Sequence, residues 1–261
     1  MNGSALVTGA GKRLGRAMAV YLAERGLDVA VHYNSSAEEA EAVARDICDM
    51  GRRAVAIQAD LIVEGDMQRL VPEAAAALDQ PLSVLVNSAS IFEYDNIETA
   101  TRESWDRHLS SNLRAPFVLT QAFAAQAPAP KVGGEWNEPT ARALIVNMID
   151  QRVRKLTPEF MTYTIAKMGL WALTRTSAQA LAPNVRVNAI GPGPTVRGTR
   201  QSRSHFERQR AATLLERGAD ADGITKALGY FIDAPAVTGQ LLCVDGGQHL
   251  AWKTPDVLGV E

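Results

Sequence analysis

The chain has 261 residues, 46% of them hydrophobic, and a formal net charge of −2 at pH 7. This length is sufficient for one α/β domain with a large core, and the charge gives no reason to expect nucleic-acid or membrane binding. The two cysteines are far apart and the four histidines are scattered, so we expect neither a metal site nor a structural disulfide.

The predicted elements alternate between short apolar strands and amphipathic helices. Seven strands are predicted, at residues 4–7, 28–33, 54–58, 83–87, 143–149, 186–190 and 240–245. Helical periodicity is clear at 15–26 and 37–51. Several strands are apolar without alternation, which is typical of a parallel sheet covered on both faces.

This order predicts an α/β fold: a single-domain, Rossmann-type doubly wound parallel sheet of about seven strands with helices on both faces, spanning residues 1–261. The first strand begins at residue 4 with no basic segment or cleavage site before it, and no apolar run has transmembrane length. We therefore expect a soluble, cytoplasmic protein.

The first strand leads into TGAGKRLG, residues 8–15, where Gly9, Gly11 and Gly15 precede a helix. Glycine permits a tight turn there, and backbone N–H groups can approach a pyrophosphate at the helix N-terminus. Arg13 adds a guanidinium that can bind an oxyanion through two hydrogen bonds. The context favours dinucleotide binding over a purely structural turn or an exposed helix-start arginine.

The second strand ends in HYNSS, residues 32–36, without the acid that usually holds the ribose 2′-hydroxyl of NAD. No carboxylate therefore repels a 2′-phosphate, and Ser35, Ser36 and Arg13 can supply donors. NADPH/NADP+ is predicted rather than NADH. An ordinary helix cap is also compatible with this segment, since Ser35 and Glu38 have the spacing of a capping box.

Two polar segments are predicted to lie outside the regular elements. Residues 127–141 are rich in Pro and Gly and predict a surface loop. Residues 196–217 are polar and Arg-rich and follow the sequence GPGP, which predicts a mobile flap beside the site. A solvated helix is the alternative for the second segment.

Tyr163 and Lys167 are four residues apart, so on a helix they share one face. A free phenol has a pKa of about 10, and an adjacent ammonium lowers it toward the range useful for acid–base catalysis. Asp150 stands at the end of the apolar run 143–149, thirteen residues before Tyr163. Alone, a Y-x-x-x-K pair would be a surface pair, but here it follows a predicted strand.

The TGAGKRLG turn and the later Tyr163–Lys167 pair, in this order along the chain, resemble motifs of the short-chain dehydrogenase/reductase family. The resemblance spans nearly the whole chain. The departures are Arg13 at a glycine position and NSAS at 87–90 where the family has NNAG. The resemblance implies that Tyr163 transfers a proton while the cofactor transfers hydride, that Lys167 holds the nicotinamide ribose, and that Asn112 helps hold Lys167 through water. It also implies a homotetramer.

The catalytic residues implied are Asn112, Asp150, Tyr163 and Lys167. The cofactor-binding residues implied are Gly9, Arg13, Leu14, Gly15, Ser35, Ser36, Asp60, Leu61, Asn87, Ala89, Tyr163, Lys167, Pro192, Gly193 and Thr195.

Asp150 occupies a position where most of the family has a serine that holds the substrate carbonyl. An ionised carboxylate has no proton to donate and repels a carbonyl oxygen that gains negative charge. Asp150 is therefore protonated or faces another group, such as a ring N–H. This favours reduction of a C=N bond in a nitrogen heterocycle.

The chain resembles one branch of the family, the pteridine reductases and bacterial dihydromonapterin/dihydrofolate reductases. The shared features are the KRLG turn, HY-x-x-S, Asp150, and Phe92 just after NSAS. An arginine that the branch carries near Ser35 is absent. Phe92 matches an aromatic that stacks on the pterin ring, with core packing as the alternative. The predicted substrate contacts are Ser90, Phe92, Asp150 and Tyr163.

The sequence thus predicts an NADPH-dependent reductase of a pterin-like small molecule, dihydropterin or dihydrofolate, with Tyr163 as proton donor. Arg197, Arg200 and Arg203 can meet an acidic substrate tail, although such charges are more often solvated. The alternative is a ketone or 3-oxoacyl-type carbonyl reductase on the same fold, in which Asp150 is merely tolerated. The intact Asn112, Tyr163 and Lys167 argue against a cofactor-binding sensor without turnover.

Overall fold

The computed structural model describes residues 3–198 and 201–254. Its centre is a seven-stranded sheet in the order β3-β2-β1-β4-β7-β8-β9, and every pair in it is parallel. The strands are β1 (Gly3–Val7), β2 (Leu27–Tyr33), β3 (Ala54–Gln58), β4 (Leu82–Asn87), β7 (Ala143–Met148), β8 (Val185–Pro192) and β9 (Leu241–Val244). The predicted parallel sheet is confirmed, and each predicted strand is present within two residues of its expected bounds.

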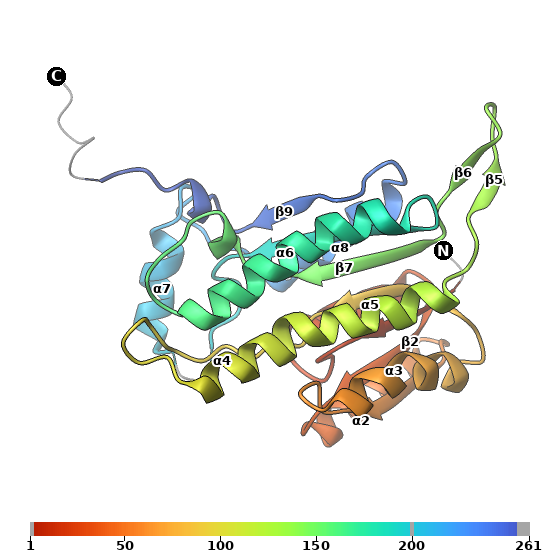
Figure 1. Ribbon diagram of the computed structural model, residues 1–261, viewed down its shortest axis with the longest axis horizontal. Helices are drawn as coiled ribbons and strands as arrows, with labels where there is room; N and C mark the ends of the chain where they lie inside the picture. The colour runs from red at the N-terminus through yellow and green to blue at the C-terminus, as the bar shows by residue number, and fades with distance from the viewer. Residues whose placement is uncertain (1–2, 199–200, 255–261) are drawn as a thin grey trace.

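Helices cover both faces of the sheet. One face carries α1 (Arg13–Glu24), α2 (Ala37–Asp49) and α8 (Ala221–Asp233). The other carries α3 (Glu64–Ala77), α5 (Ala115–Gln126) and α6 (Met161–Leu181), which lie in front of the sheet in Figure 1. Two-sided burial explains why the strands are apolar without alternation.

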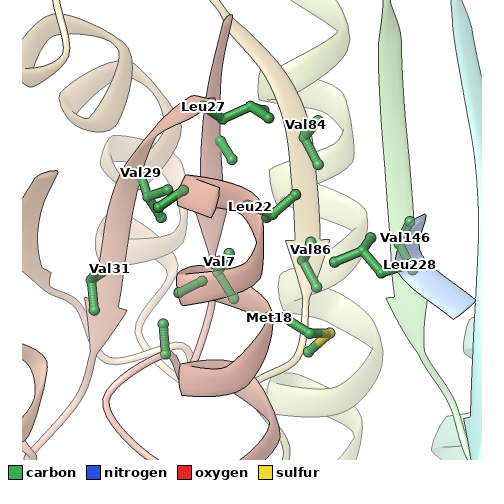
Figure 2. Close-up of a cluster of buried hydrophobic side chains, with 14 of the residues drawn as sticks. Val7, Met18, Leu22, Leu27, Val29, Val31, Val84, Val86, Val146 and Leu228 are labelled. Atoms are coloured by element: carbon green, nitrogen blue, oxygen red, sulfur yellow. The ribbon is translucent and has the colours of Figure 1, made fainter. Parts of the chain in front are cut away.

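The core under α1 shows how the sequence produces this packing. Met18 and Leu22 are four residues apart, so they project from one face of α1 and are fully buried (Figure 2). They meet valines at alternate positions of the neighbouring strands, among them Val7 and Val84. Each such side chain contributes about 1.5–3 kcal/mol by leaving water.

Two predictions about local structure were wrong. Helix α2 begins at Ala37 after Ser36, whose side chain makes no capping bond, so Ser35 and Glu38 form no capping box. The predicted loop at 127–141 contains an antiparallel hairpin, β5 (Lys131–Gly133) and β6 (Glu138–Thr140), which projects from the body of the protein (Figure 1). Gly134 and Asn137 allow the turn because both have positive φ.

The segment predicted as a flap contains a helix, α7 (Arg203–Ala211), so the helical alternative holds for these residues. Ser202 caps it by accepting a hydrogen bond from the backbone of His205 at 3.2 Å. No residue of α7 is buried. A further helix, α4 (Arg102–Leu109), precedes a π-helical segment, Ser110–Arg114, that leads into α5. Within the described ranges, none of the helices combines the length and apolar content needed to cross a bilayer.

Candidate active site

The predicted site residues meet at one edge of the sheet. Because the strands are parallel, their carboxyl ends share this edge, where β7 and β9 point to the left in Figure 1. Gly9 follows β1, Asp60 follows β3, Asn87 ends β4 and Asp150 follows β7. β1 and β4 are neighbours whose connections leave in opposite directions, and a ligand crevice forms at such a point.

The turn after β1 allows a close approach of backbone. Gly9 has φ +65°, and a Cβ there would lie 3.0 Å from the Cα of Ala89. A Cβ on Gly15 would lie 2.1 Å from the carbonyl oxygen of Gly9, so the helix start packs directly on the turn. Leu14 is partly buried against the core under α1. These features fit the predicted pyrophosphate turn.

Arg13 has φ +54°, a left-handed conformation that costs a non-glycine residue about 1 kcal/mol or more. This strain explains why a glycine is expected at that position. The guanidinium Nη2 donates to the carbonyl oxygen of Val196 at 2.8 Å, which joins the turn to the start of the 196–217 segment. Arg13 thus lies where the phosphates are predicted, but its side chain also holds a neighbouring loop.

Polar side chains form a series of hydrogen bonds at the end of β4. The hydroxyl of Thr8 accepts from the backbone N–H groups of Ser88 and Ala89 at 2.9 and 3.0 Å. The side-chain amide of Asn87 donates to Asn147 Oδ1 at 2.8 Å. Among the described residues, the buried Oδ1 of Asn87 has no hydrogen-bond partner. An orphaned acceptor beside the Gly9 turn fits a dinucleotide with ribose hydroxyls and amide groups.

The remaining predicted cofactor contacts frame the same edge. Asp60 accepts from the backbone of Ile62 at 3.0 Å, and Leu61 beside it is buried. Ser35 is exposed and Ser36 immediately precedes α2. At the end of β8, after Pro192, a Cβ on Gly193 would lie 2.6 Å from the Cα of Asp245. Thr195 donates its hydroxyl to the Gly193 carbonyl at 3.0 Å.

Asp150, Tyr163 and Lys167 lie together. The hydroxyl of Tyr163 donates to Asp150 Oδ2 at 3.0 Å, while Asp150 Oδ1 accepts from the backbone of Arg152 at 2.8 Å. One turn along α6, Lys167 Nζ donates to the carbonyl oxygen of Met148 at 2.8 Å and lies 5.6 Å from the centre of the Tyr163 ring. Tyr163 and Lys167 are both buried.

The electrostatics of this cluster differ from the expectation for Tyr163. Burial, and then the charge of Asp150, raise the pKa of Tyr163 well above its ordinary value, so the prediction that Lys167 lowers it was wrong here. The group at the phenol oxygen is Asp150, whereas Lys167 contacts Met148. Burial raises the pKa of Asp150 and lowers that of Lys167 to about 8, although Asp150 opposes the latter. Tyr163 therefore keeps its proton at neutral pH and can act as an acid.

Asn112 is fully buried in the π-helical segment. Its side chain pairs with the backbone of Ile91, accepting from the N–H at 2.9 Å and donating to the carbonyl at 2.8 Å. The side chain therefore fixes the segment that precedes Phe92. The predicted link to Lys167 through water stays a prediction.

Two aromatic side chains, Phe92 and Phe160, lie beside Tyr163. The ring of Phe92 is 51% exposed, so the core-packing alternative was wrong. It stacks on Phe160 with centroids 4.3 Å apart and meets the edge of Tyr163 at 4.7 Å. The guanidinium of Arg152 lies 5.1 Å from the centre of Phe160. Ser90 is exposed, and its hydroxyl donates to the Ile91 carbonyl at 3.3 Å.

The flap arginines form local contacts. Arg197 donates to the carbonyl of Gln201 at 3.4 Å, and Arg203 pairs with Glu207 at 2.7 Å on an exposed face. Arg200 lies outside the described residues. These contacts fit the solvated alternative for Arg203.

Sequence reasoning missed a network beneath Tyr163. Buried Asp95 accepts from the backbone N–H of Thr162 at 3.1 Å, from the Thr162 hydroxyl, and from Ser104 Oγ at 3.1 Å. His108 Nε2 accepts from the backbone of Glu93 at 3.2 Å, so its Nδ1 carries the proton that faces Thr162 Oγ1 at 2.7 Å. The network anchors the first turn of α6. Asp95 and Thr162 are 67 positions apart, and no sequence pattern linked them.

Comparisons with known proteins agree with this geometry. A family model described as enoyl-(acyl carrier protein) reductase matches residues 9–249. The crystal structure of FolM alternative dihydrofolate reductase 1 from Brucella suis in complex with NADP is 43% identical, with a TM-score of 0.89 over 98% of each chain. The Brucella canis structure of the same name, complexed with NADP, is 41% identical with a TM-score of 0.88, again over 98% of each chain.

Sequence comparison also finds a carbonyl reductase. The chain is 30% identical over 256 residues to the 3-oxoacyl-[acyl-carrier-protein] reductase FabG of Staphylococcus epidermidis, which covers 96% of this chain and 100% of that protein. The family match spans most of the chain, and the relatives include both FolM-type and FabG-type reductases. The chain therefore belongs to the short-chain dehydrogenase/reductase family and is an NAD(P)-dependent reductase.

Proposed function

We propose that the protein reduces a C=N bond in a pterin-like bicyclic substrate, a dihydropterin or dihydrofolate, with NADPH as the hydride source and Tyr163 as the proton donor. The observation that carries the proposal is the carboxylate of Asp150, 3.0 Å from the hydroxyl of Tyr163. A carbonyl reductase needs a neutral donor at that place, because negative charge develops on the substrate oxygen. A nitrogen heterocycle instead presents N–H groups, which a carboxylate accepts.

The roles of the residues follow from their protonation states. Bound NADPH supplies the hydride. Tyr163, whose pKa is raised, keeps its proton and delivers it to the ring nitrogen of the bond being reduced. Asp150 orients the ring by accepting from a substrate N–H, and the exposed ring of Phe92 offers a flat apolar surface for stacking. Lys167, hydrogen-bonded to Met148, holds the ribose that carries the nicotinamide.

Several observations support NADPH as the cofactor. No acid ends β2, where Ser35 and Ser36 are the side chains available to a 2′-phosphate, and Arg13 lies in the turn after β1. The orphaned Asn87 Oδ1 and the close approach of Gly9 to Ala89 fit a dinucleotide. The Brucella FolM structures were solved with NADP.

Reduction of a ketone or 3-oxoacyl group is the second candidate, and the 30% identity to FabG favours it. The test measures kcat/KM with NADPH for dihydropterins, dihydrofolate and a panel of ketones, in the wild-type protein and in Asp150→Ser and Asp150→Asn. We expect both variants to lose pterin and folate reduction, because neither can carry the charge that holds a substrate N–H.

The two variants differ in their expected effect on ketones. Asp150→Ser should leave ketone reduction equal or improved, because a neutral hydroxyl replaces a carboxylate beside the developing oxyanion. Asp150→Asn keeps the size of the side chain without its charge and so controls for volume. If Asp150→Ser leaves pterin reduction untouched, the carboxylate is incidental and the carbonyl reductase becomes the better assignment.

We also propose a homo-oligomer, by family resemblance a tetramer. Apolar side chains on the outer face of α5 and α6 support it: Phe117, Ile165 and Met168 are each 38–41% exposed. Light scattering after size-exclusion chromatography tests this, and a monomer at micromolar concentration would contradict it. A cytoplasmic location, the single-domain organisation and the roles of individual site residues remain predictions.

A further inference from the structure

His32 connects two loops of the proposed cofactor site. It lies next to the last residue of β2 and is 2% exposed. Its Nδ1 accepts a hydrogen bond from the backbone N–H of Gly9 at 3.0 Å, and its Nε2 lies 3.0 Å from the carbonyl oxygen of Ala59. Gly9 belongs to the turn proposed to hold the pyrophosphate. Ala59 directly precedes Asp60, which the family resemblance implies contacts the adenine of the cofactor.

The two contacts require one tautomer of a neutral imidazole. Since the backbone N–H of Gly9 is a donor, Nδ1 has to be unprotonated, and Nε2 therefore carries the hydrogen that it donates to Ala59. Burial lowers the pKa of His32 to about 4, although the hydrogen bond to Ala59 and the charges of Asp60 and Asp66 oppose this, and Arg69 lowers it a little further. At pH 7 the ring is neutral, and each nitrogen keeps its single role.

His32 acts at the end of the sheet ladder, where only single backbone hydrogen bonds still connect β2 to the two loops. The β1–β2 pairing ends at Val7 and Val31, so the Gly9 turn lies beyond it. Beyond that point, His32 holds the turn twice: its carbonyl oxygen accepts from Ala10 at 2.9 Å, and its ring accepts from Gly9. On the other side, the β2–β3 pairing ends at Tyr33 and Gln58. The N–H of Ala59 still donates to the Tyr33 carbonyl at 3.0 Å, and the His32 ring adds a second hydrogen bond to Ala59 through its carbonyl oxygen.

We propose that His32 is a positioning residue for the dinucleotide, which fixes the spacing between the Gly9 turn and the Ala59–Asp60 loop so that the phosphates and the adenosine are bound together. This role is independent of whether the substrate is a pterin or a ketone. Without the two ring hydrogen bonds, one backbone hydrogen bond from β2 to each loop remains, so the loops sample a wider range of spacings and cofactor binding has to restore the native one at a cost in affinity. A ligand that spans both loops should therefore lose more affinity than a ligand that reaches only one.

Three substitutions separate the two hydrogen bonds. In His32→Asn, the side-chain oxygen takes the place of Nδ1 and can accept from Gly9, but nothing reaches Ala59. In His32→Gln, the longer amide takes the place of Nε2 and can donate to Ala59, whereas the acceptor for Gly9 is lost. His32→Leu removes both. Val29→Ala, also buried in β2 but away from both loops, is the matched control for loss of core packing.

The measurement is the Kd of NADPH by nicotinamide fluorescence and the Kd of inorganic pyrophosphate by calorimetry, each compared with the unfolding midpoint. A hydrogen bond contributes about 0.5–1.5 kcal/mol, so His32→Asn and His32→Gln, which each lose one, should raise the Kd of NADPH roughly two- to tenfold. His32→Leu loses both and should raise it roughly 4- to 100-fold. Pyrophosphate contacts only the Gly9 turn, so its binding should weaken in His32→Gln and His32→Leu but not in His32→Asn. At saturating NADPH, kcat should stay within about twofold, because the reacting groups are untouched.

Two results would overturn the proposal. One is an unchanged Kd for NADPH in His32→Leu together with a lowered unfolding midpoint, as expected for Val29→Ala. The other is that Asn and Gln bind NADPH no better than Leu, because partial rescue by each amide is the specific consequence of two separate hydrogen bonds. If His32→Leu does not fold, the other two variants still decide the question, because pyrophosphate binding should weaken in His32→Gln and stay unchanged in His32→Asn.

Discussion

Replacing Asp95 by alanine should lower both the stability of the protein and its turnover. Asp95 is 2% exposed and accepts from the backbone N–H of Thr162 at 3.1 Å, from the Thr162 hydroxyl and from Ser104. Thr162 is itself buried, so the variant leaves two buried donors without their acceptor. Each costs about 1–3 kcal/mol, which gives a loss of about 4 kcal/mol in the free energy of unfolding. For a chain of this size, that lowers the Tm by roughly 8–16 °C.

The effect on turnover follows from the position of Tyr163, the residue directly after Thr162. A displacement of its hydroxyl by about 1 Å costs on the order of 100-fold in rate. Asp95→Asn keeps one oxygen for the Thr162 N–H, and its amide can donate to the Thr162 hydroxyl, so its loss should be about 1 kcal/mol. Stability is measured by urea unfolding followed through tryptophan fluorescence, and kcat is measured below the unfolding transition.

Asp28→Ala is the control for a buried carboxylate that lies far from the site. Asp28 accepts from the Arg53 backbone at 2.9 Å, from Arg53 Nε at 3.0 Å and from Gln80 at 3.0 Å, near the start of β2 at the opposite edge of the sheet. We expect it to lose stability while the folded protein keeps its kcat. Wild-type kcat in folded Asp95→Ala would refute the idea that this network positions Tyr163.

Four further changes test the site. Tyr163→Phe should lower kcat by about 10²–10⁴-fold while the enzyme still binds NADPH, and near-normal turnover would exclude Tyr163 as the proton donor. Arg13→Ala should weaken NADPH more than NADH in fluorescence titrations if the guanidinium contacts the 2′-phosphate, and both equally if it contacts the pyrophosphate; NADH binding as tight as NADPH in the wild type would contradict the cofactor preference. Phe92→Ala should raise KM for bicyclic substrates, and a sharp fall in the unfolding midpoint instead would indicate a packing role. The pKa of Lys167 is about 8 in the folded protein and ordinarily 10.5, so between these pH values the unfolded chain binds more protons than the folded one. The stability of the wild type relative to Lys167→Met should therefore rise from pH 8 to 10.5. A difference in urea midpoints that stays constant over this range would count against this reasoning.

The strands of the sheet could be predicted from the sequence because most of them are runs of β-branched and aliphatic residues, which can be recognised without knowledge of their neighbours. In the middle of the sheet, as in β1, β4 and β7, such a run is buried on both faces, whereas the edge strands β3 and β9 are only partly buried. The β5–β6 hairpin was missed for the opposite reason. Its strands have three residues each, include Pro139, and are mostly exposed, so no apolar periodicity marks them.

The candidate site was predictable where a residue acts through the backbone conformation at a strand end, as at Gly9 and Gly15. It was not predictable where the partner comes from a distant segment. Phe160 stacks on Phe92 across 68 positions of the chain, and Thr162 meets Asp95 across 67. These contacts depend on how α6 docks beside the segment that follows β4, which no local pattern describes.

The protonation of Tyr163 shows most clearly what the sequence pattern alone leaves open. A lysine four residues along a helix lies beside the tyrosine ring, and here Lys167 Nζ is bound to Met148 rather than to the phenol oxygen. The phenol oxygen instead meets the partly buried carboxylate of Asp150 at 3.0 Å. Ionising both would place two negative charges side by side in a buried site, so the pair retains a proton at neutral pH. Reduction consumes such a proton, whereas oxidation needs a phenolate to receive one. Asp150 in place of a serine therefore fits a site that works in the direction of reduction. In the function that we propose, it also fits a substrate whose ring nitrogen shares the proton that Tyr163 and Asp150 hold between them.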